Sequence, residues 1–380
     1  MIPFISLERR TQLHADEINK TITEVVNSGW YLLGGRLKQF EHEYAHYIGT
    51  QYCIGVSNGL DAITLIYRAY IEMGWMKPGD EVIVPANTYI ASILAISENK
   101  LRPVLVEPDA RTLLMDPNLI ERHITPKTKS ILMVHLYGRC AWSETVRNLC
   151  QKYDLLLVED NAQAHGCRCE EGMTGALGDA AAHSFYPTKN LGALGDAGAV
   201  TTNDSQLAEV VYALRNYGSS RKYIFDYKGR NCRMDEIQAA VLSVRLKYLE
   251  EENEKRRKIA ALYHEQIASP FVTLPDPMAT ESNVWHLFPI ICGDGKSICK
   301  REGDDLTLRD RLRHFLLAKN IETQVHYPIP PHRQRCYHEL SFLSLPITDL
   351  IHATELSLPI GPELSLEDAA QVANVINQFE

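Results

Sequence analysis

The sequence predicts an α/β fold with a large domain, in which a mostly parallel sheet of seven strands lies between helices, and a smaller C-terminal α/β domain. Two observations support this prediction. Short runs of Val, Ile and Leu alternate with segments of helical period from about residue 52 to about residue 217, which is typical of a parallel sheet covered by helices. A long charged segment then separates this part from a second group of strand and helix patterns. A chain of 380 residues can bury cores in both parts.

The elements of the first part follow one another in a mostly β/α order. The expected helices include Leu60–Met73, Ser143–Tyr153 and Ser205–Arg215. The last two expected strands leave no room for a helix between them, so we predict that part of the sheet is antiparallel. The expected strands are Cys53–Val56, Glu81–Pro85, Pro103–Glu107, Ser130–His135, Leu155–Asp160, Ala181–Phe185 and Ala199–Thr202.

The second part begins with the charged segment Met234–Ala268, which we interpret as a connecting helix. Its Lys/Glu-rich stretch Lys247–Lys258 predicts a solvated helix face. We therefore divide the chain into residues 1–235 and 236–380. The remaining elements are a strand at Leu287–Cys292, an exposed glycine-rich loop at Gly293–Asp305, a helix at Leu306–Lys319, a proline-rich turn at Tyr327–Pro331 and a helix at Glu367–Phe379.

Composition and charge exclude several classes of protein. Hydrophobic residues make up 45% and charged residues 23%, as in an ordinary globular protein. The 39 basic and 48 acidic residues give a net charge of −9, which argues against nucleic acid as the main ligand. The sequence shows neither a signal-peptide pattern nor a membrane span, so we expect a cytoplasmic protein without a membrane partner.

The cysteines suit reduced thiols better than a disulfide framework, because the nine of them are odd in number and scattered. Cys167 and Cys169 lie close to His165 and could form part of a metal site. A tetrahedral site needs further ligands at a recognisable spacing, and none follows. We therefore predict no metal.

Asp160 ends the expected strand Leu155–Asp160 and is the first candidate for a site residue. Ligands of open α/β sheets bind at the carboxyl ends of the strands. Taken alone, the position favours the interpretation as a helix N-cap or a turn residue.

Lys189 lies in the loop that follows the expected strand Ala181–Phe185. Pro187, Thr188, Asn190 and several glycines surround it, and such a loop can desolvate an ammonium enough for it to react as an amine. A surface lysine is the ordinary alternative. The uncharged loop and the acid one strand earlier argue against that alternative, since the acid could partner a pyridinium nitrogen.

A phosphate cradle is available in the segment Gly55–Ala62, where a strand turns into an apolar helix. Free N–H groups and the dipole at a helix N-terminus favour a phosphate, although a Ser-Asn-Gly turn is also an ordinary capped helix start. A phosphate cup, an acid at a strand end and a buried lysine are together the parts that a pyridoxal 5′-phosphate (PLP) site requires.

At these residues the chain resembles the DegT/DnrJ/StrS family of PLP-dependent sugar aminotransferases, a fold-type I group, over essentially its whole length. The resemblance implies that residues 1–235 form the PLP-binding domain. Several motifs are weak individually, and their order makes the combination specific. The matching stretches are Ser28–Gly34, Gly55–Ala62, Pro85–Ser92, His135–Gly138, Glu159–Gly166, Ser184–Lys189, Gly229–Ala240 and His326–His332.

The resemblance implies a role for each matching position. Lys189 matches the lysine that forms the Schiff base with PLP, and Asp160 matches the carboxylate that keeps the ring nitrogen protonated. Gln163 matches a side chain beside the phenolic oxygen of the ring, and Tyr89 matches an aromatic on the ring face.

Four further positions match phosphate-binding residues: Ser184, Gly59, Leu60 and, from the neighbouring subunit, Asn231. A site completed by another chain implies a homodimer. Many relatives have Thr at the position of Leu60. Because leucine has no hydroxyl group, only the backbone N–H of Leu60 can bind the phosphate. Relatives in which histidine replaces the lysine become dehydratases, and Lys189 argues against that activity.

The implied reaction is a ping-pong transamination in which L-glutamate donates its amino group to a nucleotide-linked keto-deoxysugar. The form of Asn58–Ala62 resembles the branch that acts on dTDP-linked 3-keto-6-deoxyhexoses, and the product would be an amino sugar for surface polysaccharides or glycoconjugates. Arg230 stands where that branch often has Tyr. We expect the substrate side to include Tyr31, Tyr217, His326 and Tyr327, each of which could instead be a packing aromatic or a loop histidine.

Three alternatives stay open. The chain could be a PLP-binding regulator that catalyses nothing, although it is acidic and carries no recognisable DNA-binding module. It could aminate C4 of the sugar instead of C3. A nicotinamide-dependent oxidoreductase is disfavoured, because Gly192, Gly195 and Gly198 are spaced GxxGxxG and lead into a strand where a dinucleotide fingerprint would lead into a helix.

Overall fold

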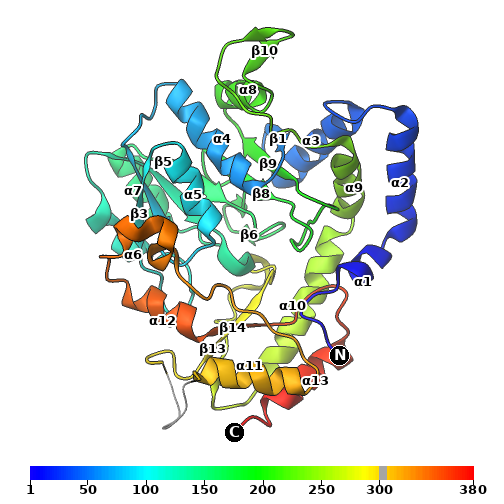
Figure 1. The fold of residues 1–380 in the computed structure, drawn as a ribbon, viewed down its shortest axis with the longest axis vertical. Coiled ribbons are helices and arrows are strands. Elements are labelled where there is room, and N and C mark those ends of the chain that lie inside the picture. Colours follow the sequence, from blue (N-terminus) through cyan, green and yellow to red (C-terminus); the bar gives the residue numbers. More distant parts are fainter. Residues whose placement is uncertain (299–305) are drawn as a thin grey trace.

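The computed structural model describes residues 1–298 and 306–380 and centres on a seven-stranded sheet of order β1-β9-β8-β5-β4-β2-β3 (Figure 1). β9 runs antiparallel to both of its neighbours, and the other pairings are parallel. This confirms the predicted α/β class and the antiparallel part. The strands are β1 (Tyr52–Val56), β2 (Glu81–Pro85), β3 (Arg102–Val106), β4 (Thr128–Val134), β5 (Leu156–Asp160), β8 (Ala180–Ser184) and β9 (Gly198–Thr202).

Each predicted strand of the sheet is present. Most of these strands begin or end one or two residues away from the predicted positions. The largest shift is in β4, which begins at Thr128 instead of Ser130. Gly198 begins β9, so the glycine-rich loop leads into a strand as expected. Because β9 is antiparallel to both β1 and β8, the carboxyl ends of β1 and β8 lie at the same edge as those of β5 and β4.

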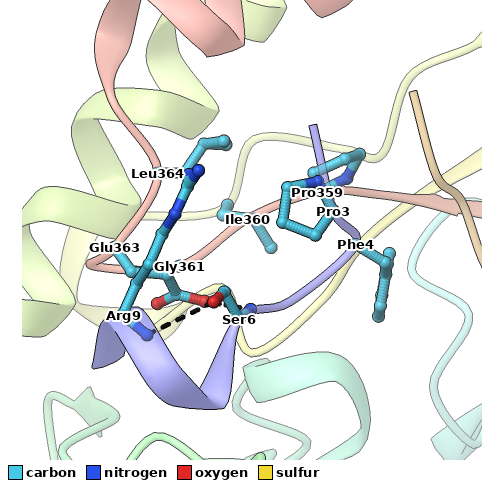
Figure 2. A pocket seen from close by; sticks show the side chains of 9 residues that line it. All are labelled: Pro3, Phe4, Ser6, Arg9, Pro359, Ile360, Gly361, Glu363 and Leu364. Carbon is cyan, nitrogen blue, oxygen red and sulfur yellow. Dashed lines mark hydrogen bonds between the residues drawn. The ribbon is translucent and has the colours of Figure 1, made fainter. Parts of the chain in front are cut away.

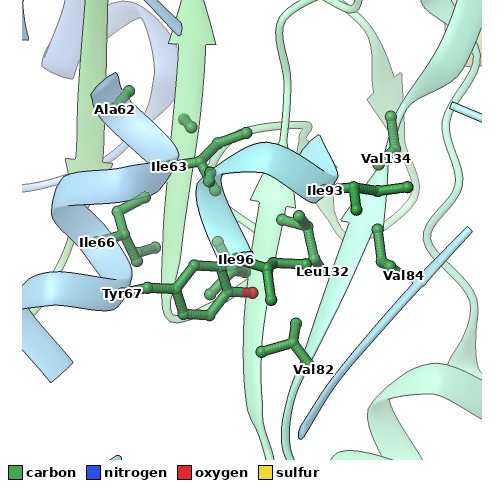
Figure 3. Packing of buried hydrophobic residues seen from close by; sticks show 14 of the residues in the cluster. Ala62, Ile63, Ile66, Tyr67, Val82, Val84, Ile93, Ile96, Leu132 and Val134 are labelled. Carbon is green, nitrogen blue, oxygen red and sulfur yellow. The ribbon is translucent and has the colours of Figure 1, made fainter. Parts of the chain in front are cut away.

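Helices cover both faces of the sheet, and alternate side chains of each strand face opposite layers. On one face, Ile63 and Ile66 of α4 and Ile93 and Ile96 of α5 pack on strand side chains such as Val82 (Figure 3). On the other face, α7 packs on Ile83 and its neighbours. These helices are α4 (Gly59–Glu72), α5 (Ile90–Glu98), α6 (Pro117–Ile120), α7 (Glu144–Tyr153) and α8 (Ser205–Leu214).

The N-terminal helices and α9 (Glu236–Leu246) form a layer beside β1 and β9. Leu37 and Phe40 share a buried cluster with Ala239 and Leu242 of α9. Glu236 lies in the first turn of α9, and its carboxylate accepts hydrogen bonds from the backbone N–H groups of Gly34 (2.7 Å) and Arg36 (2.8 Å) at the start of the neighbouring helix. The N-terminal helices are α1 (Leu7–Gln12), α2 (Ala15–Ser28) and α3 (Gly35–Ile48).

The segment expected as a single connecting helix is two helices, α9 and α10 (Leu249–Gln266), and its charged face is not fully solvated. The prediction of a solvated face at Lys247–Lys258 was wrong at Glu252, Asn253 and Arg256, which are buried. The reason is that α10 lies between the two parts of the chain (Figure 1). Other parts of the chain therefore cover one side of this helix.

The C-terminal part packs three strands, β12 (Val272–Thr273), β13 (Phe288–Cys292) and β14 (Glu355–Leu358), with helices around an apolar cluster. Ile2 belongs to the same cluster, because residues 2–6 lie along this part: the N–H of Phe4 donates to Glu322 at 3.2 Å. The boundary at residue 235 stays a prediction. The helices are α11 (Leu308–Ala318), α12 (Pro346–Thr354) and α13 (Leu366–Ile376).

Smaller elements connect these layers, and the most prominent is the protruding hairpin of β10 (Ser219–Arg221) and β11 (Ile224–Phe225) (Figure 1). Residues 299–305 of the expected glycine-rich loop, with Cys299, lie outside the described residues. In the described part of the chain, the other cysteines are free thiols, and no helix combines the length and apolar character that crossing a membrane requires. The remaining elements are β6 (Arg168–Cys169), β7 (Gly172–Met173) and the short 3-10 helices Glu121–His123, Leu136–Gly138, Thr280–Ser282, Pro331–Arg333 and Arg335–Leu340.

Candidate active site

The carboxyl edge of the sheet brings together the ends of the strands that carry the predicted site residues. In the register of the sheet, Gly198 is opposite both Val56 and Ser184, and Val134 is opposite Asp160. The loops that follow these strands therefore start side by side. Open α/β sheets bind ligands at this edge.

Asp160 ends β5 and is held in one orientation by two hydrogen bonds. The hydroxyl of Ser92 donates to Oδ2 at 2.7 Å, and the N–H of Ala162 donates to Oδ1 at 3.2 Å. The side chain is buried, with 7% of the residue exposed. These bonds fix the orientation of the carboxylate, which can accept a hydrogen bond from a protonated group of a ligand.

Lys189 lies in the loop after β8, and the buried side chain of Arg10 holds the backbone of this loop in place. The guanidinium of Arg10 donates to the carbonyl oxygens of Thr188 (3.2 Å) and Asn190 (2.5 Å). Desolvation lowers the pKa of Lys189 to about 8, while the negative charge of Asp160 opposes that shift. The two side chains that carry the predicted chemistry therefore act on one another electrostatically, and the lysine is easier to deprotonate than one in water.

This lowered pKa predicts the pH at which Lys189 reacts with an aldehyde. At pH 7 a lysine with a pKa of about 8 is neutral in about one molecule in ten, compared with about one in three thousand for a lysine at 10.5. We expect the rate at which cofactor-free protein attaches PLP covalently to rise with pH and to level off above a midpoint near 8. Stopped-flow absorbance from pH 6 to 10 measures it, with N-acetyl-lysine as the reference amine. A midpoint as high as that of the reference amine would contradict the prediction.

A cup for an anion lies where the start of α4 meets the end of β8. A Cβ placed on Gly59 would lie 2.6 Å from Cβ and 3.2 Å from Oγ of Ser184, so only glycine lets the helix approach this closely. Asn58 is the N-cap, its side chain accepting from the N–H of Asp61 at 2.8 Å. The first N–H groups of the helix, at Gly59 and Leu60, have no partner within the helix and can bind a phosphate.

Replacing Gly59 with alanine tests this cup. We expect Gly59→Ala to raise the dissociation constant of PLP by about tenfold or more, because the new methyl group collides with Ser184. Fluorescence titration of the cofactor-free protein measures the constant. The matched control is Gly35→Ala at the first position of α3, where an added Cβ meets nothing within 4 Å. Equal affinities of the two variants would contradict the prediction.

Gln163 belongs to a connected group of side chains that also includes four other residues. Its Oε1 accepts from the N–H of Tyr137 at 2.6 Å, and its Nε2 donates to the hydroxyl of Tyr327 at 3.1 Å. The hydroxyl of Tyr137 donates to the carbonyl of His326 at 2.8 Å. The ring of Tyr89 lies 5.2 Å from that of Tyr327 between ring centres. The structure thus brings Gln163, Tyr89, His326 and Tyr327 together.

His326 is a neutral imidazole in this position. Burial, followed by the positive charge of Lys189, lowers its pKa to about 4. Its Nδ1 lies 2.9 Å from the hydroxyl of Ser357, and its backbone N–H donates to Glu355 at 2.6 Å. At neutral pH it can therefore exchange hydrogen bonds with a ligand without adding charge.

Tyr31, Tyr217 and Asn231 lie apart from this cluster on an exposed surface. Tyr31 is 52% and Tyr217 49% exposed, and Asn231 pairs with Asn216 beside the protruding hairpin. The guanidinium of Arg233 lies 5.5 Å from the ring centre of Tyr217. The segment of Asn231 also runs beside the start of α4, since the N–H of Ser57 donates to the carbonyl of Cys232 at 3.2 Å and Arg230 pairs with Asp61 at 3.5 Å.

Sequence reasoning missed several residues that shape the site. Ser92, which donates a hydrogen bond to Asp160, is the last residue of the matching stretch Pro85–Ser92, but the resemblance implies no role for it. Arg10 lies 178 residues from the loop it fixes, so no local pattern could reveal it. Cys167 and Cys169 lie in a small apolar cluster, and the described residues contain no group of three or more metal-ligating side chains.

Comparisons with known proteins cover nearly the whole chain. The model of the DegT/DnrJ/EryC1/StrS aminotransferase family matches residues 12–377. A protein of Aneurinibacillus thermoaerophilus, named dTDP-3-amino-3,6-dideoxy-alpha-D-galactopyranose transaminase, is 49% identical over 379 residues, which are 100% of this chain and 99% of that protein.

Two solved structures have the same fold. DesV of S. venezuelae is 42% identical with a TM-score of 0.92, and the match covers 99% of this chain and 98% of DesV. The Bacillus subtilis protein NtdA, solved with its cofactor PMP bound, is 32% identical with a TM-score of 0.88, over 99% of this chain and 84% of NtdA.

Proposed function

The chain belongs to the DegT/DnrJ/EryC1/StrS aminotransferase family, and on that premise we propose that it moves the amino group of L-glutamate to C3 of a dTDP-linked 3-keto-6-deoxyhexose. Membership and the similarity to named transaminases make it a PLP-dependent aminotransferase of nucleotide-linked sugars with a fold-type I architecture. The donor, the position of amination and the roles of single residues are our proposal.

The observation that carries the proposal is that three features come together at the carboxyl edge of the sheet. They are the hydrogen-bonded carboxylate of Asp160, the desolvated Lys189 on which that carboxylate acts electrostatically, and the close approach of Gly59 to Ser184. The residues present fit PLP: the cup suits its phosphate, the fixed carboxylate suits its protonated ring nitrogen, and the desolvated lysine suits its aldehyde. We assign Leu60 to the phosphate through its backbone N–H, Tyr89 to the ring face and Gln163 to the phenolic oxygen. When bound, PLP supplies an electron sink for the charge that develops at the reacting carbon.

Lys189 moves the proton in both halves of the reaction. As a neutral amine, its Nζ takes the proton from the α-carbon of the donor, and in the second half it delivers a proton to the sugar carbon that receives the nitrogen. Ser92 and Ala162 hold the carboxylate of Asp160 in place by donating a hydrogen bond to each of its oxygens. Arg10 keeps the lysine loop in place while Nζ changes partners.

The sugar nucleotide needs an open surface, because its diphosphate and base are too large for a sealed pocket. We assign His326 and Tyr327 to the sugar, and Tyr31 and Tyr217 to the more exposed parts of the substrate. The name of the 49% identical relative supports a dTDP-linked sugar aminated at C3. Amination at C4 is the alternative.

A homodimer would bring the exposed residues to an active site. Trp30, Tyr31, Tyr217, Tyr223 and Phe225 expose large aromatic side chains on the N-terminal layer and the protruding hairpin. Such a surface is typical of an interface. In a two-fold dimer, Asn231 of each subunit would then reach the phosphate of the other.

The test is an absorption spectrum of the PLP-loaded protein, followed by product analysis. We expect a band of covalently bound cofactor near roughly 400–430 nm that L-glutamate converts to the band of the aminated cofactor. A dTDP-3-keto-6-deoxyhexose should restore the first band, and mass spectrometry should find the 3-amino sugar. Restoration by the 4-keto isomer alone would favour the alternative. Cofactor binding without any response to an amino donor would point to a regulator.

A further inference from the structure

A cavity of about 100 Å³ lies beside the lysine loop, on the side of the C-terminal part. Thr188, the residue before Lys189, forms one wall, and His326 forms another. Gln324 is its one exposed lining residue. The rest of the wall is formed by Phe4, Ile5, Arg256, His286, Leu287 and Ile360.

Arg256 of α10 contributes a buried cation to this cavity. The residue is 1% exposed, and its Nη1 donates to the carbonyl of Ile360 at 3.1 Å and, at the limit of a hydrogen bond, to that of Trp285 at 3.5 Å. Its Nε and Nη2 are buried and have no hydrogen-bond partner. Burial is the main cause that lowers its pKa, to about 10, so the guanidinium is charged at neutral pH. Unpartnered buried donors on a charged group are costly, which indicates that an anion completes the site.

Two carboxylates, Glu252 and Glu363, act electrostatically on Arg256. Glu252 has other partners, and Glu363 has one at its Oε1, while its Oε2 is buried without a hydrogen-bond partner. Glu252 pairs with His14 at 3.1 Å and with Arg10 at 3.8 Å. Glu363 accepts from the N–H of Ser6 at 3.4 Å, where the N-terminal segment runs along residues 359–364 (Figure 2). Within the described residues, no acidic group forms an ion pair with Arg256. Both carboxylates act on it only from a distance.

The other polar groups of the cavity do not neutralise this charge. Burial lowers the pKa of His286 well below its usual value, and the positive charges of Lys189 and Arg256 lower it further. His326 is neutral for similar reasons. The cavity is therefore a positive, partly apolar pocket next to the lysine that moves the proton, and it is too small for a sugar nucleotide.

We propose that this cavity is the subsite for a carboxylate of the amino donor, with Arg256 as its anchor. The inference rests on the proposed function, because a transaminase must hold its amino acid and 2-oxo acid within reach of Lys189. Arginine binds a carboxylate through parallel hydrogen bonds, and Nε with Nη2 is the pair of donors left free. Phe4, Ile5 and Leu287 supply apolar walls for the methylene groups of the donor.

The experiment measures the binding of glutarate, which has two carboxylates but no amino or keto group, to the PLP-loaded protein by calorimetry. Arg256→Met should weaken glutarate about tenfold to a hundredfold, the range for charged hydrogen bonds. The KM for L-glutamate should rise by a similar factor, whereas the KM for the keto-sugar should not change. L-norvaline, which lacks the second carboxylate, identifies the one that is bound: a rise in its KM assigns the α-carboxylate, and no rise assigns the side-chain carboxylate.

Two further variants keep the test decisive. Arg257→Met alters the adjacent arginine, which pairs with Glu254 at 3.4 Å and does not line the cavity, and it should leave glutarate binding unchanged. Arg256→Lys keeps the charge but not the paired donors, and it should weaken glutarate by a smaller factor than Arg256→Met. If Arg256→Met does not fold, the glutarate affinity of Arg256→Lys tests the proposal instead.

The proposal is overturned if the Arg256 variants show the cofactor band and bind glutarate as tightly as wild type. It is also overturned if they lose affinity for the sugar nucleotide instead. A wild-type protein that shows no cofactor band would refute the proposed function first, so the two failures are distinguishable.

Discussion

Lys189→Ala should reduce amino transfer by about 10⁴-fold or more, because the variant loses both the covalent anchor of the cofactor and the group that moves the proton. The loop itself should persist, since Arg10 holds it through the backbone carbonyls of residues 188 and 190 and not through the lysine side chain. The variant should therefore fold and still bind PLP through the cup. Single-turnover absorbance after adding L-glutamate measures the loss.

The control for this variant is Lys247→Ala, which removes an exposed lysine that pairs with Glu17 at 3.1 Å, and it should keep full activity. Adding a small primary amine such as ethylamine should restore part of the proton transfer to Lys189→Ala but none of the covalent anchor. If Lys189→Ala turned over at the wild-type rate, another residue would have to carry the proton, and the assignment would fail.

Asp160→Asn should lower kcat by about 10²- to 10³-fold, the range for the loss of one preorganised electrostatic group. The amide keeps the shape of the carboxylate but not its charge, so the ring nitrogen of the cofactor loses the group that keeps it protonated. Substrate affinity should change much less than kcat, because Asp160 acts on the reacting system and not on the bound sugar. Stopped-flow measurement of each half-reaction checks both statements.

Two variants serve as references for Asp160→Asn. Ser92→Ala removes one of the two hydrogen bonds that fix the carboxylate, and it should cost less than the loss of the charge. Asp179→Asn alters a carboxylate that accepts from the N–H of Leu157 at 2.7 Å, toward the other end of β5. It should affect stability and not the spectrum of the cofactor. A normal kcat in Asp160→Asn would remove Asp160 from the proposed mechanism.

The sheet and the residues at its carboxyl edge were within reach of sequence reasoning for a physical reason. Strands buried on both faces are short apolar runs, so β2 and β5 could be located to within a residue. Asp160 follows directly from the end of such a run. Lys189 could be singled out because the composition of its loop, poor in charge and rich in glycine, differs from that of a solvated surface.

What the sequence pattern could not show is which element covers which face. The stretch Lys247–Lys258 has the composition of a solvated helix, yet Asn253 and Arg256 are buried, because segments distant in the sequence pack over α10. The amide of Asn253 donates to the carbonyl of His165 at 2.9 Å, a contact across 88 residues. Arg10 was missed for the same reason. Contacts of this kind depend on the assembled fold and leave no periodicity in the sequence.

The N-terminal segment can dock only late in synthesis, because its partners lie near the other end of the chain. Phe4 and Ile5 line the cavity of Arg256, and the contacts that hold the segment in place are formed with Ile321, Glu322 and Glu363. The hydrogen bond from Phe4 to Glu322 spans 318 residues, so the first residues to be synthesised must wait for some of the last before they can dock. The seven strands of the large sheet, by contrast, all lie between residues 52 and 202 and are synthesised well before residues 321–363. Until residues 321–363 are synthesised, Phe4 and Ile5 therefore lack the partners that hold them in the wall of the cavity.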